Sequence, residues 1–310
     1  MKTFAKLFLF SATVISLGGC GGNSPESSTK KDPEPVDVVV ISGQSNAVGC
    51  TYQSYIKNTV GTNKYYEFME GYPGIQIAFD SWTKDTWTSP GNTYYYSQNK
   101  SKNDNFVKVM LGQGNSNATF GPEIGIAEKL HETRSNKLFL IKYACGASNL
   151  KDDWATRDSE MYPRLLSYVK LQIQNLKDKG YVPTIRAVCW MQGEGDTYPG
   201  YYTDYYDNTK LFVGNLREDL RELSGNKDFV FVDAGINNSK AWEYWRPVNE
   251  AKEQFASESE NNIYIDTIGA GLHTNKEDNG DGDAHYDSDS QVKLGNLFAE
   301  AFEPYLMKLE

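Results

Sequence analysis

The segment Val36–Gly49, VDVVVISGQSNAVG, constrains the fold more than any other part of the chain. The apolar residues before its turn are all β-branched, and only Asp37 interrupts them. Such a run predicts a strand buried on both faces, as in a parallel sheet covered by helices. A polar turn begins at Gly43, so Ser45 follows the carboxyl end of the strand. Open α/β sheets place their sites at that edge, although an ordinary polar turn explains the same residues.

The first residues are predicted to be a lipoprotein signal peptide and not part of the fold. Residues 1–19 combine a Lys-containing start, the apolar segment Leu7–Leu17 and small residues before Cys20. The apolar segment is too short to span a bilayer as a permanent helix. Leu17–Cys20 resembles the bacterial lipobox, which implies cleavage before Cys20 and a lipid on its sulfur; an ordinary secretory signal is the alternative. We therefore expect an extracytoplasmic, membrane-anchored lipoprotein, at the cell surface or in the periplasm.

The mature chain is expected to be a tether followed by one domain. Residues 20–35 are rich in Gly, Ser and Pro and have nothing to bury, whereas residues 36–310 suit one large α/β domain. The formal net charge of −10 argues against nucleic acid as a partner, since nucleic acid requires a basic face. Cys50, Cys145 and Cys189 would remain after cleavage, and an odd number favours buried thiols over a disulfide framework.

Strands and helices alternate along this domain. We expect strands at 36–41, 74–79, 138–143, 185–191, 229–233 and 263–266, and helices at 122–131, 161–179, 201–223, 248–256 and 291–306. This alternation predicts βαβ units and a parallel sheet covered on both faces. The stretch 51–117 is harder to interpret. Its aromatic side chains, which include Trp82, Trp87 and Tyr94–Tyr96, either stack on sugar rings or pack a long loop.

A serine nucleophile needs a base, and histidine is the usual one. The chain has 3 histidines. His131 falls inside an expected helix among charged residues, as a solvated face residue would, and His273 lies in a polar loop. His285 stands between Asp283 and the last helix, where a carboxylate can orient its imidazole and stabilise the cation. We therefore predict that His285 is the partner of Ser45; a solvated loop histidine is the alternative.

Three groups are candidates for stabilising an oxyanion. They are the backbone N–H of Ser45, the backbone N–H of Gly121 and the side-chain amide of Gln192. Gly121 has no Cβ, so a substrate can approach its backbone closely. The alternatives are a plain turn at Gly121 and a polar strand end at Gln192.

Four sequence blocks, taken together, resemble those of SGNH-type hydrolases. They are GQSNAVG at 43–49, FGPEIG at 120–125, WMQGEGD at 190–196 and DAHYDSDSQVKLG at 283–295. More narrowly, they resemble the carbohydrate-esterase branch that includes acetyl xylan esterases (carbohydrate esterase family 6) and sialate O-acetylesterases. IKYACGASNL at 141–150 is similar to that family's post-strand loop, though members more often carry a second Gly where Cys145 stands.

The resemblance implies a flavodoxin-like three-layer α/β/α sandwich with a central parallel sheet. It also implies ester hydrolysis without a metal or other cofactor. By motif match, Ser45 becomes the nucleophile and His285 the general base. Ser45 N–H, Gly121 N–H and the Gln192 amide become the oxyanion donors.

The catalytic acid departs from the family pattern. An Asp usually stands three residues before the His, and here that position is Gly282. Asp283 and Asp281 flank it, and Glu194 from the third block has the acid role in some interpretations of this branch. The resemblance favours Asp283 and then Glu194 as the acid beside His285, and a dyad steadied by a backbone carbonyl is also open.

Two other site types fit the sequence poorly. Gly-x-Ser-x-Gly is absent around Ser45, which argues against an α/β-hydrolase lipase. The Asp-rich run 278–289 suggests a calcium-binding loop. Counting from Asp281, however, the fifth position is His285 and the twelfth is Val292, which does not match an EF-hand.

The sequence thus predicts a serine carboxylic-ester hydrolase that removes acetyl groups from an acetylated polysaccharide or oligosaccharide. Acetyl xylan or a related plant glycan is the first substrate expected, and 9-O-acetyl sialic acid the second. A sialate site would require a basic group for the substrate carboxylate, for which Arg246 and Lys142 are candidates. The displaced acid and the aromatic-rich stretch leave a second class open, a sugar-binding surface lipoprotein without turnover.

Overall fold

The computed structural model describes residues 32–86, 93–101, 105–274 and 284–309, and Pro33–Glu310 forms one compact unit. The predicted signal peptide, Cys20 and most of the tether lie outside the described residues, as do Trp87, Asp281 and Asp283. Within the described ranges, no helix has both the length and the apolar character needed to cross a membrane.

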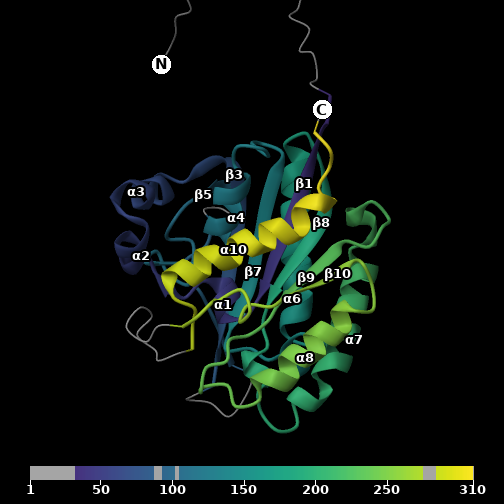
Figure 1. Cartoon of the computed structure of the whole chain (residues 1–310). Helices are drawn as coiled ribbons and strands as arrows, with labels where there is room; N and C mark the ends of the chain where they lie inside the picture. Colours follow the sequence, from purple (N-terminus) through teal and green to yellow (C-terminus); the bar gives the residue numbers. More distant parts are fainter. Residues whose placement is uncertain (1–31, 87–92, 102–104, 275–283, 310) are drawn as a thin grey trace, which may run out of the picture. The chain divides into compact units, whose positions relative to one another are not determined.

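A mostly parallel sheet forms the centre of this unit (Figure 1). The strands are β1 (Glu34–Gly43), β2 (Thr51–Tyr52), β3 (Tyr72–Asp85), β4 (Thr93–Tyr96), β5 (Val107–Val109), β6 (Thr119–Phe120), β7 (Leu138–Gly146), β8 (Tyr181–Met191), β9 (Val230–Ala234) and β10 (Asn262–Ile265). The main sheet has the order β10-β9-β8-β1-β7-β3-β4, and β5 also pairs with β3. Strands β10 to β3 run parallel, whereas β4 and β5 are antiparallel to β3.

Helices cover both faces of the sheet. They are α1 (Ser45–Val48), α2 (Gln53–Val60), α3 (Thr62–Glu70), α4 (Glu123–Leu130), α5 (Leu150–Asp153), α6 (Met161–Asp178), α7 (Tyr205–Asp219), α8 (Trp245–Ala256) and α10 (Ser288–Phe302), with short 3₁₀ turns at Glu194–Asp196, Tyr202–Asp204, Arg221–Ser224 and Glu303–Tyr305. Helices α4 and α10 pack together on one face, and α10 crosses in front of the sheet in Figure 1. On the other face, α6 packs against β7 and β8, while Phe231 of β9 contacts Phe212 of α7 and Phe255 of α8.

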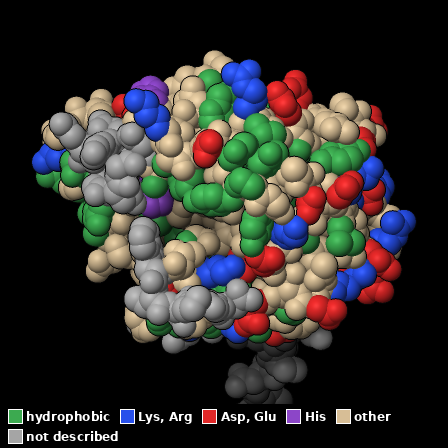
Figure 2. All heavy atoms as spheres, turned by 90° about the horizontal axis from the view of Figure 1, so that it is seen from below, with side chains coloured by type: hydrophobic (Ala, Val, Ile, Leu, Met, Phe, Trp, Pro, Cys, Tyr) green, Lys and Arg blue, Asp and Glu red, His purple; other side chains and the backbone are tan. Residues whose placement is uncertain are grey.

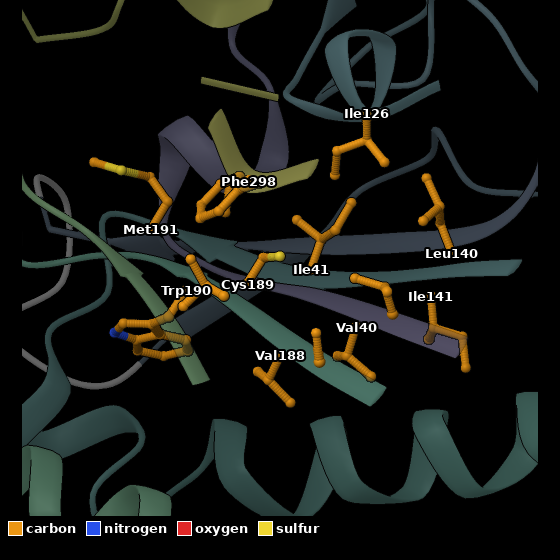
Figure 3. Close-up of a cluster of buried hydrophobic side chains, with 14 of the residues drawn as sticks. Val40, Ile41, Ile126, Leu140, Ile141, Val188, Cys189, Trp190, Met191 and Phe298 are labelled. Carbon is orange, nitrogen blue, oxygen red and sulfur yellow. The ribbon is translucent and has the colours of Figure 1, made fainter. Parts of the chain in front are cut away.

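The core alternates across the sheet as a doubly covered parallel sheet requires (Figure 3). Ile41 points toward Ile126 and Phe298, which come from α4 and α10. Val40 and Val188 point to the opposite side, toward α6. All five side chains are buried. The predicted α/β/α sandwich with a central parallel sheet is therefore confirmed.

The central strands end together at the edge that carries the candidate site. Gly43, the last residue of β1, is in register with Ala144 of β7 and Met191 of β8. Gly43 has φ +136°, and a Cβ there would lie 2.0 Å from the Met191 carbonyl oxygen. Only glycine therefore allows β1 to turn this close to β8. Ser45 follows at once, so the strand places it at the carboxyl edge.

The structure departs from the sequence-based expectations mainly between 51 and 117. Two short helices, α2 and α3, fill Gln53–Glu70, and the edge strands β4 and β5 were not expected. Their sequences are polar and aromatic, and each helix buries only one side chain, so hydrophobic periodicity is weak there. The helix expected at 201–223 is also interrupted: α7 covers Tyr205–Asp219 and 3₁₀ turns flank it.

Candidate active site

The Ser45 turn is held by backbone contacts on both sides. The Gln44 N–H donates to the Met191 carbonyl oxygen at 2.9 Å, which fixes the chain before Ser45. Helix α1 ends at Gly49, which has φ +93°, and a Cβ at that glycine would lie 2.4 Å from the Gly121 nitrogen. The Ser45 segment is thus packed between the end of β8 and the Gly121 turn.

The segments that carry Ser45 and His285 meet through their neighbours. The Tyr286 N–H donates to Asn46 Oδ1 at 3.1 Å, across 240 positions of sequence. Gln291 at the start of α10 donates from Nε2 to the Asn46 carbonyl oxygen at 2.8 Å. These contacts are buried, so the residue after Ser45 is tied to the residue after His285 at the carboxyl edge of the sheet.

Glu194 lies in the same cluster. Asn46 Nδ2 donates to Glu194 Oε1 at 2.7 Å, and Glu194 is fully buried. Burial raises the pKa of Glu194, while the Asn46 hydrogen bond and the charges of Lys252 and His285 act in the opposite direction. Asp283 and Asp281, the other acid candidates, lie outside the described residues.

The Gly121 N–H is already hydrogen-bonded. It donates to Glu123 Oε1 at 2.9 Å, and the other oxygen of Glu123 accepts from Lys142 Nζ at 2.8 Å. Lys142 also donates to the carbonyl oxygens of Val48 (3.0 Å) and Gln113 (2.7 Å). This buried ion pair links the end of α1 to the Gly121 turn. Lys142 is 1% exposed, so of the two candidates for binding a substrate carboxylate, this one is not accessible to a substrate.

The Gln192 amide is held in one orientation. Tyr205 donates its hydroxyl to Gln192 Oε1 at 3.0 Å, which fixes Nε2 as the donor end. Nε2 then donates to Asp196 Oδ2 at 2.6 Å and to Gln44 Oε1 at 3.2 Å. Burial raises the pKa of Asp196 to about 6, against the hydrogen bonds it accepts from Leu150 N–H and Gln192.

Gln44 is a site residue that the sequence analysis did not single out. Its Oε1 accepts from Gln192, from the Gly193 N–H at 3.3 Å and from the Gly195 N–H at 3.1 Å. This one oxygen therefore joins the Ser45 turn to the third sequence block. The only feature of the sequence that could have identified Gln44 as a site residue is its position between Gly43 and Ser45.

Of the three oxyanion candidates, Gly121 and Gln192 thus donate to protein acceptors. The Ser45 N–H, at the start of α1, makes no hydrogen bond within the described residues. Ser45 itself is only partly buried, whereas Gln192 is fully buried. An oxyanion beside Ser45 would find that N–H available, and the other two donors would have to share or exchange their present partners.

A second buried ion pair lies beneath the third block. Lys252 of α8 donates to Asp233 at the end of β9, and its Nζ lies 5.3 Å from the centre of the Tyr205 ring. Burial raises the pKa of Asp233 to about 6, and the Lys252 charge opposes the shift. Asp233 Oδ2 has no hydrogen-bond partner among the described residues. This pair supports the Gln192 network from below, through Tyr205.

The other two histidines lie in different surroundings. His131 caps α4 and remains partly exposed, and its ring centre lies 4.6 Å from that of Tyr72. His273 is largely exposed, and its Nε2 lies 3.5 Å from Asp287. Asp287 accepts from the Ser290 N–H at 2.8 Å and so caps α10. This cap gives one member of the Asp-rich run a structural role.

The aromatic residues of 51–117 mainly pack the edge of the sheet. Trp82 lies 4.9 Å from Tyr96 between ring centres, and the Cζ of Arg164 lies 4.3 Å from the centre of the Trp82 ring. Tyr94 donates to Asp153, which also accepts from a lysine. Tyr95 is 54% exposed. Packing therefore explains three of these four side chains.

Comparison with known proteins identifies a family and a shared fold. The family model described as "Carbohydrate esterase, sialic acid-specific acetylesterase" matches residues 35–303. No curated protein matches the sequence.

Three solved structures are similar. NanS has a TM-score of 0.61 at 15% identity, covering 89% of this chain and 98% of its own. An Arabidopsis thaliana protein has a TM-score of 0.58 at 20% identity, covering 88% of this chain and 100% of its own. A carbohydrate acetylesterase from Xanthomonas citri has a TM-score of 0.50 at 15% identity, covering 87% of this chain and 56% of its own. At these identities the likeness shows the shared fold.

Proposed function

Because the chain belongs to the carbohydrate esterase family of sialic acid-specific acetylesterases, we propose that it is a carbohydrate O-acetylesterase that uses Ser45 and His285. The observation that carries the proposal is the hydrogen bond between Asn46 and Tyr286. It joins the two segments on which the nucleophile and the base would stand. A family match alone does not show whether Ser45 and His285 are close together. The hydrogen bond shows that the residues next to them are in direct contact.

The proposed reaction has two steps. Ser45 Oγ attacks the acetyl carbonyl carbon while His285 takes the hydroxyl proton, and an oxyanion forms. The bond from the carbonyl carbon to the sugar oxygen then breaks, and the imidazolium returns the proton to that oxygen. Water next attacks the acetyl-serine with His285 as the base, which releases acetate and restores Ser45.

Among the described residues, Glu194 is the acid that we propose. It is buried and accepts a hydrogen bond from Asn46, whose own oxygen accepts from the N–H of the residue after His285. A carboxylate there would stabilise the imidazolium that forms during attack. Comparison of Glu194→Gln with Asp283→Asn tests this directly. Loss of about 10²-fold or more in kcat for Glu194→Gln alone supports Glu194, and the reverse result assigns the role to Asp283.

Acetyl xylan or a related neutral glycan is our first substrate proposal, and 9-O-acetyl sialic acid is the second. The burial of Lys142 removes one of two candidate partners for a sialate carboxylate and leaves Arg246. Acetate release from acetylated xylan, mannan, pectin and sialoglycan would rank the substrates. Preferential hydrolysis of the sialoglycan would reverse our order.

The enzyme proposal is tested with p-nitrophenyl acetate, which needs no glycan subsite. Ser45→Ala and His285→Ala should abolish turnover, and Gln192→Ala should lower kcat at least about tenfold, as expected for an oxyanion donor. Circular dichroism controls for folding. Wild-type turnover in Ser45→Ala would eliminate the mechanism, and an inactive wild-type protein that still binds sugar would favour the sugar-binding lipoprotein instead.

Lipid attachment at Cys20, and with it an extracytoplasmic location, is part of the same proposal. It rests on the sequence of residues 17–20. Labelled fatty acid should be incorporated into the wild-type protein and not into Cys20→Ala. Equal labelling of both would exclude this site.

A further inference from the structure

A groove with a volume of about 360 Å³ opens between α8 and the residues that follow β10. Its lining combines aromatic, charged and aliphatic side chains: Trp245, Arg246, Asn249, Glu250, Glu253, Tyr264, Asp266 and Ile268. This volume falls within the range of small-ligand sites. None of these residues belongs to the Ser45 cluster.

One end of the groove lies at the same edge of the sheet as Ser45. Asp266 directly follows β10, at the carboxyl end of a parallel strand, and Trp245 begins α8, the helix that follows β9, while the other α8 residues extend the groove along that helix. In the order β10-β9-β8-β1, three strand spacings separate the groove from the Ser45 strand. At about 4.8 Å per spacing, β10 and β1 lie about 14 Å apart across the sheet. Figure 2 views this edge, where hydrophobic side chains lie among acidic and basic ones.

Aromatic side chains bridge that interval. Tyr202, from the turn after β8, stacks on Tyr244 with ring centres 4.5 Å apart and planes 9° from parallel. Tyr244 is the residue before Trp245. Tyr198, in the same turn as Tyr202, is 53% exposed. The stacked Tyr202–Tyr244 pair therefore links the segment after β8, which contains Gln192 and Glu194, to the start of α8 at the groove.

The charges in the groove identify the kind of ligand it suits. Arg246 stacks on Trp245, with its Cζ 5.1 Å from the ring centre, and forms no ion pair among the described residues. Three carboxyl groups, from Glu250, Glu253 and Asp266, share the lining. One cation among three carboxylates repels an anionic sugar, whereas the same groups donate to and accept from hydroxyls. Trp245 adds a flat apolar surface for a sugar ring.

We propose that this groove is a subsite for neutral sugar units of the same glycan chain from which Ser45 removes an acetyl group. The glycan would run from Ser45 over the ends of β8 and β9, along Tyr202 and Tyr244, to Trp245. The inference rests on the proposed function for the site of reaction, but the binding part can be measured separately. It assigns Trp245, Arg246 and Glu253 to recognition of substrate far from the reacting ester.

The kinetic test compares substrates of different length. For Trp245→Ala, the ratio of kcat/KM on an acetylated xylohexaose to kcat/KM on an acetylated xylose monosaccharide should fall about tenfold, because remote contacts act only on the long substrate. Glu253→Gln keeps the size of the side chain and should lower the same ratio by a factor of about three. Tyr66→Ala is the matched control, since Tyr66 is an exposed aromatic on α3. Its ratio should equal the wild-type ratio, and an unchanged ratio in both groove variants would overturn the proposal.

The binding test does not need turnover. Titration calorimetry of the Ser45→Ala protein with unacetylated xylohexaose should show binding that Trp245→Ala weakens, and tetragalacturonate should bind less tightly. Tighter binding of tetragalacturonate would overturn the neutral-sugar assignment. A wild-type protein that fails on p-nitrophenyl acetate but binds xylohexaose through Trp245 would reject the esterase proposal and keep the subsite. A wild-type protein that hydrolyses p-nitrophenyl acetate but does not bind xylohexaose would support the esterase proposal and reject the subsite.

Discussion

The two buried lysine–carboxylate pairs differ in what they hold. Lys142 pairs with Glu123 and also bonds the carbonyl oxygens of Val48 and Gln113, and Glu123 accepts from a backbone N–H. Lys252 pairs with Asp233 alone, and one oxygen of Asp233 has no hydrogen-bond partner among the described residues.

Burial alone therefore does not determine what a buried ion pair stabilises. A buried pair stabilises a protein only when its remaining hydrogen-bonding capacity is satisfied. The Lys142 pair satisfies backbone groups at the end of α1 and in the Gly121 turn, so it fixes the Ser45 side of the site. The Lys252 pair satisfies no backbone group, so it contributes charge and packing beneath Gln192 and Tyr205.

Breaking the Lys142 pair should have the largest effect. Lys142→Met leaves Glu123 charged and buried and removes the donor to two carbonyl groups. We expect a loss of about 3–5 kcal/mol in the free energy of unfolding, measured by urea denaturation. A loss below about 1 kcal/mol, in the range of exposed ion pairs, would show that the Lys142–Glu123 pair does not hold the end of α1 and the Gly121 turn together.

Replacing both members of each pair sharpens the comparison. Lys252→Met with Asp233→Leu should be within about 1 kcal/mol of wild type, because well-packed apolar residues can replace a buried pair at little cost. Lys142→Met with Glu123→Leu should remain destabilised by about 2 kcal/mol or more, because backbone groups lose their partners. If both double variants had the same free energy of unfolding, the backbone contacts of the Lys142 pair would not distinguish it from the Lys252 pair.

The pH dependence should distinguish the Lys252 pair. The pKa of Asp233 is raised from 3.8 to about 6, so the folded state binds more protons than the unfolded state between these values. Its stabilising contribution is complete below about 3.8 and is lost as the pH rises through about 6. Between pH 4 and 7, wild type should therefore lose free energy of unfolding relative to Asp233→Asn. Parallel curves for the two proteins would contradict this.

A smaller effect is expected where the Lys252 pair meets the site. Tyr205→Phe removes the hydroxyl that donates to Gln192 Oε1. We expect a loss of about 1–2 kcal/mol in stability, because a buried acceptor is left unsatisfied. The kcat on p-nitrophenyl acetate should fall while KM changes little, because the Gln192 amide can rotate. Wild-type kcat in Tyr205→Phe would show that Asp196 and Gln44 are enough to orient the amide.

The smallest effect is expected at an exposed pair. Lys129 and Glu300 lie 2.7 Å apart between helices α4 and α10, and both side chains are largely solvated. Lys129→Ala should change the free energy of unfolding by no more than about 1 kcal/mol, and salt should reduce the change. If Lys129→Ala lowered the free energy of unfolding as much as Lys142→Met does, solvent exposure would not explain the difference between the ion pairs.

Much of the fold could be predicted from the sequence because its signals are local. The β-branched run before Gly43 is β1, the strand expected at 138–143 is β7, and the helix expected at 161–179 is α6. These elements are strongly periodic or uniformly apolar. Helices α2 and α3 were missed because each buries a single side chain and gives almost no periodic signal.

The sequence by itself determined the order of the elements. Residue type, local pattern and the family resemblance together identified the candidates Ser45, His285, Asp283, Glu194 and Gln192. Only the tertiary structure decided which buried polar groups are partners. Lys142 was one of two candidates for binding a substrate carboxylate and instead pairs with Glu123. Gln44 was overlooked although it joins two blocks. Such pairings depend on how strands and turns distant in sequence pack at one edge of the sheet, and no local pattern encodes that proximity.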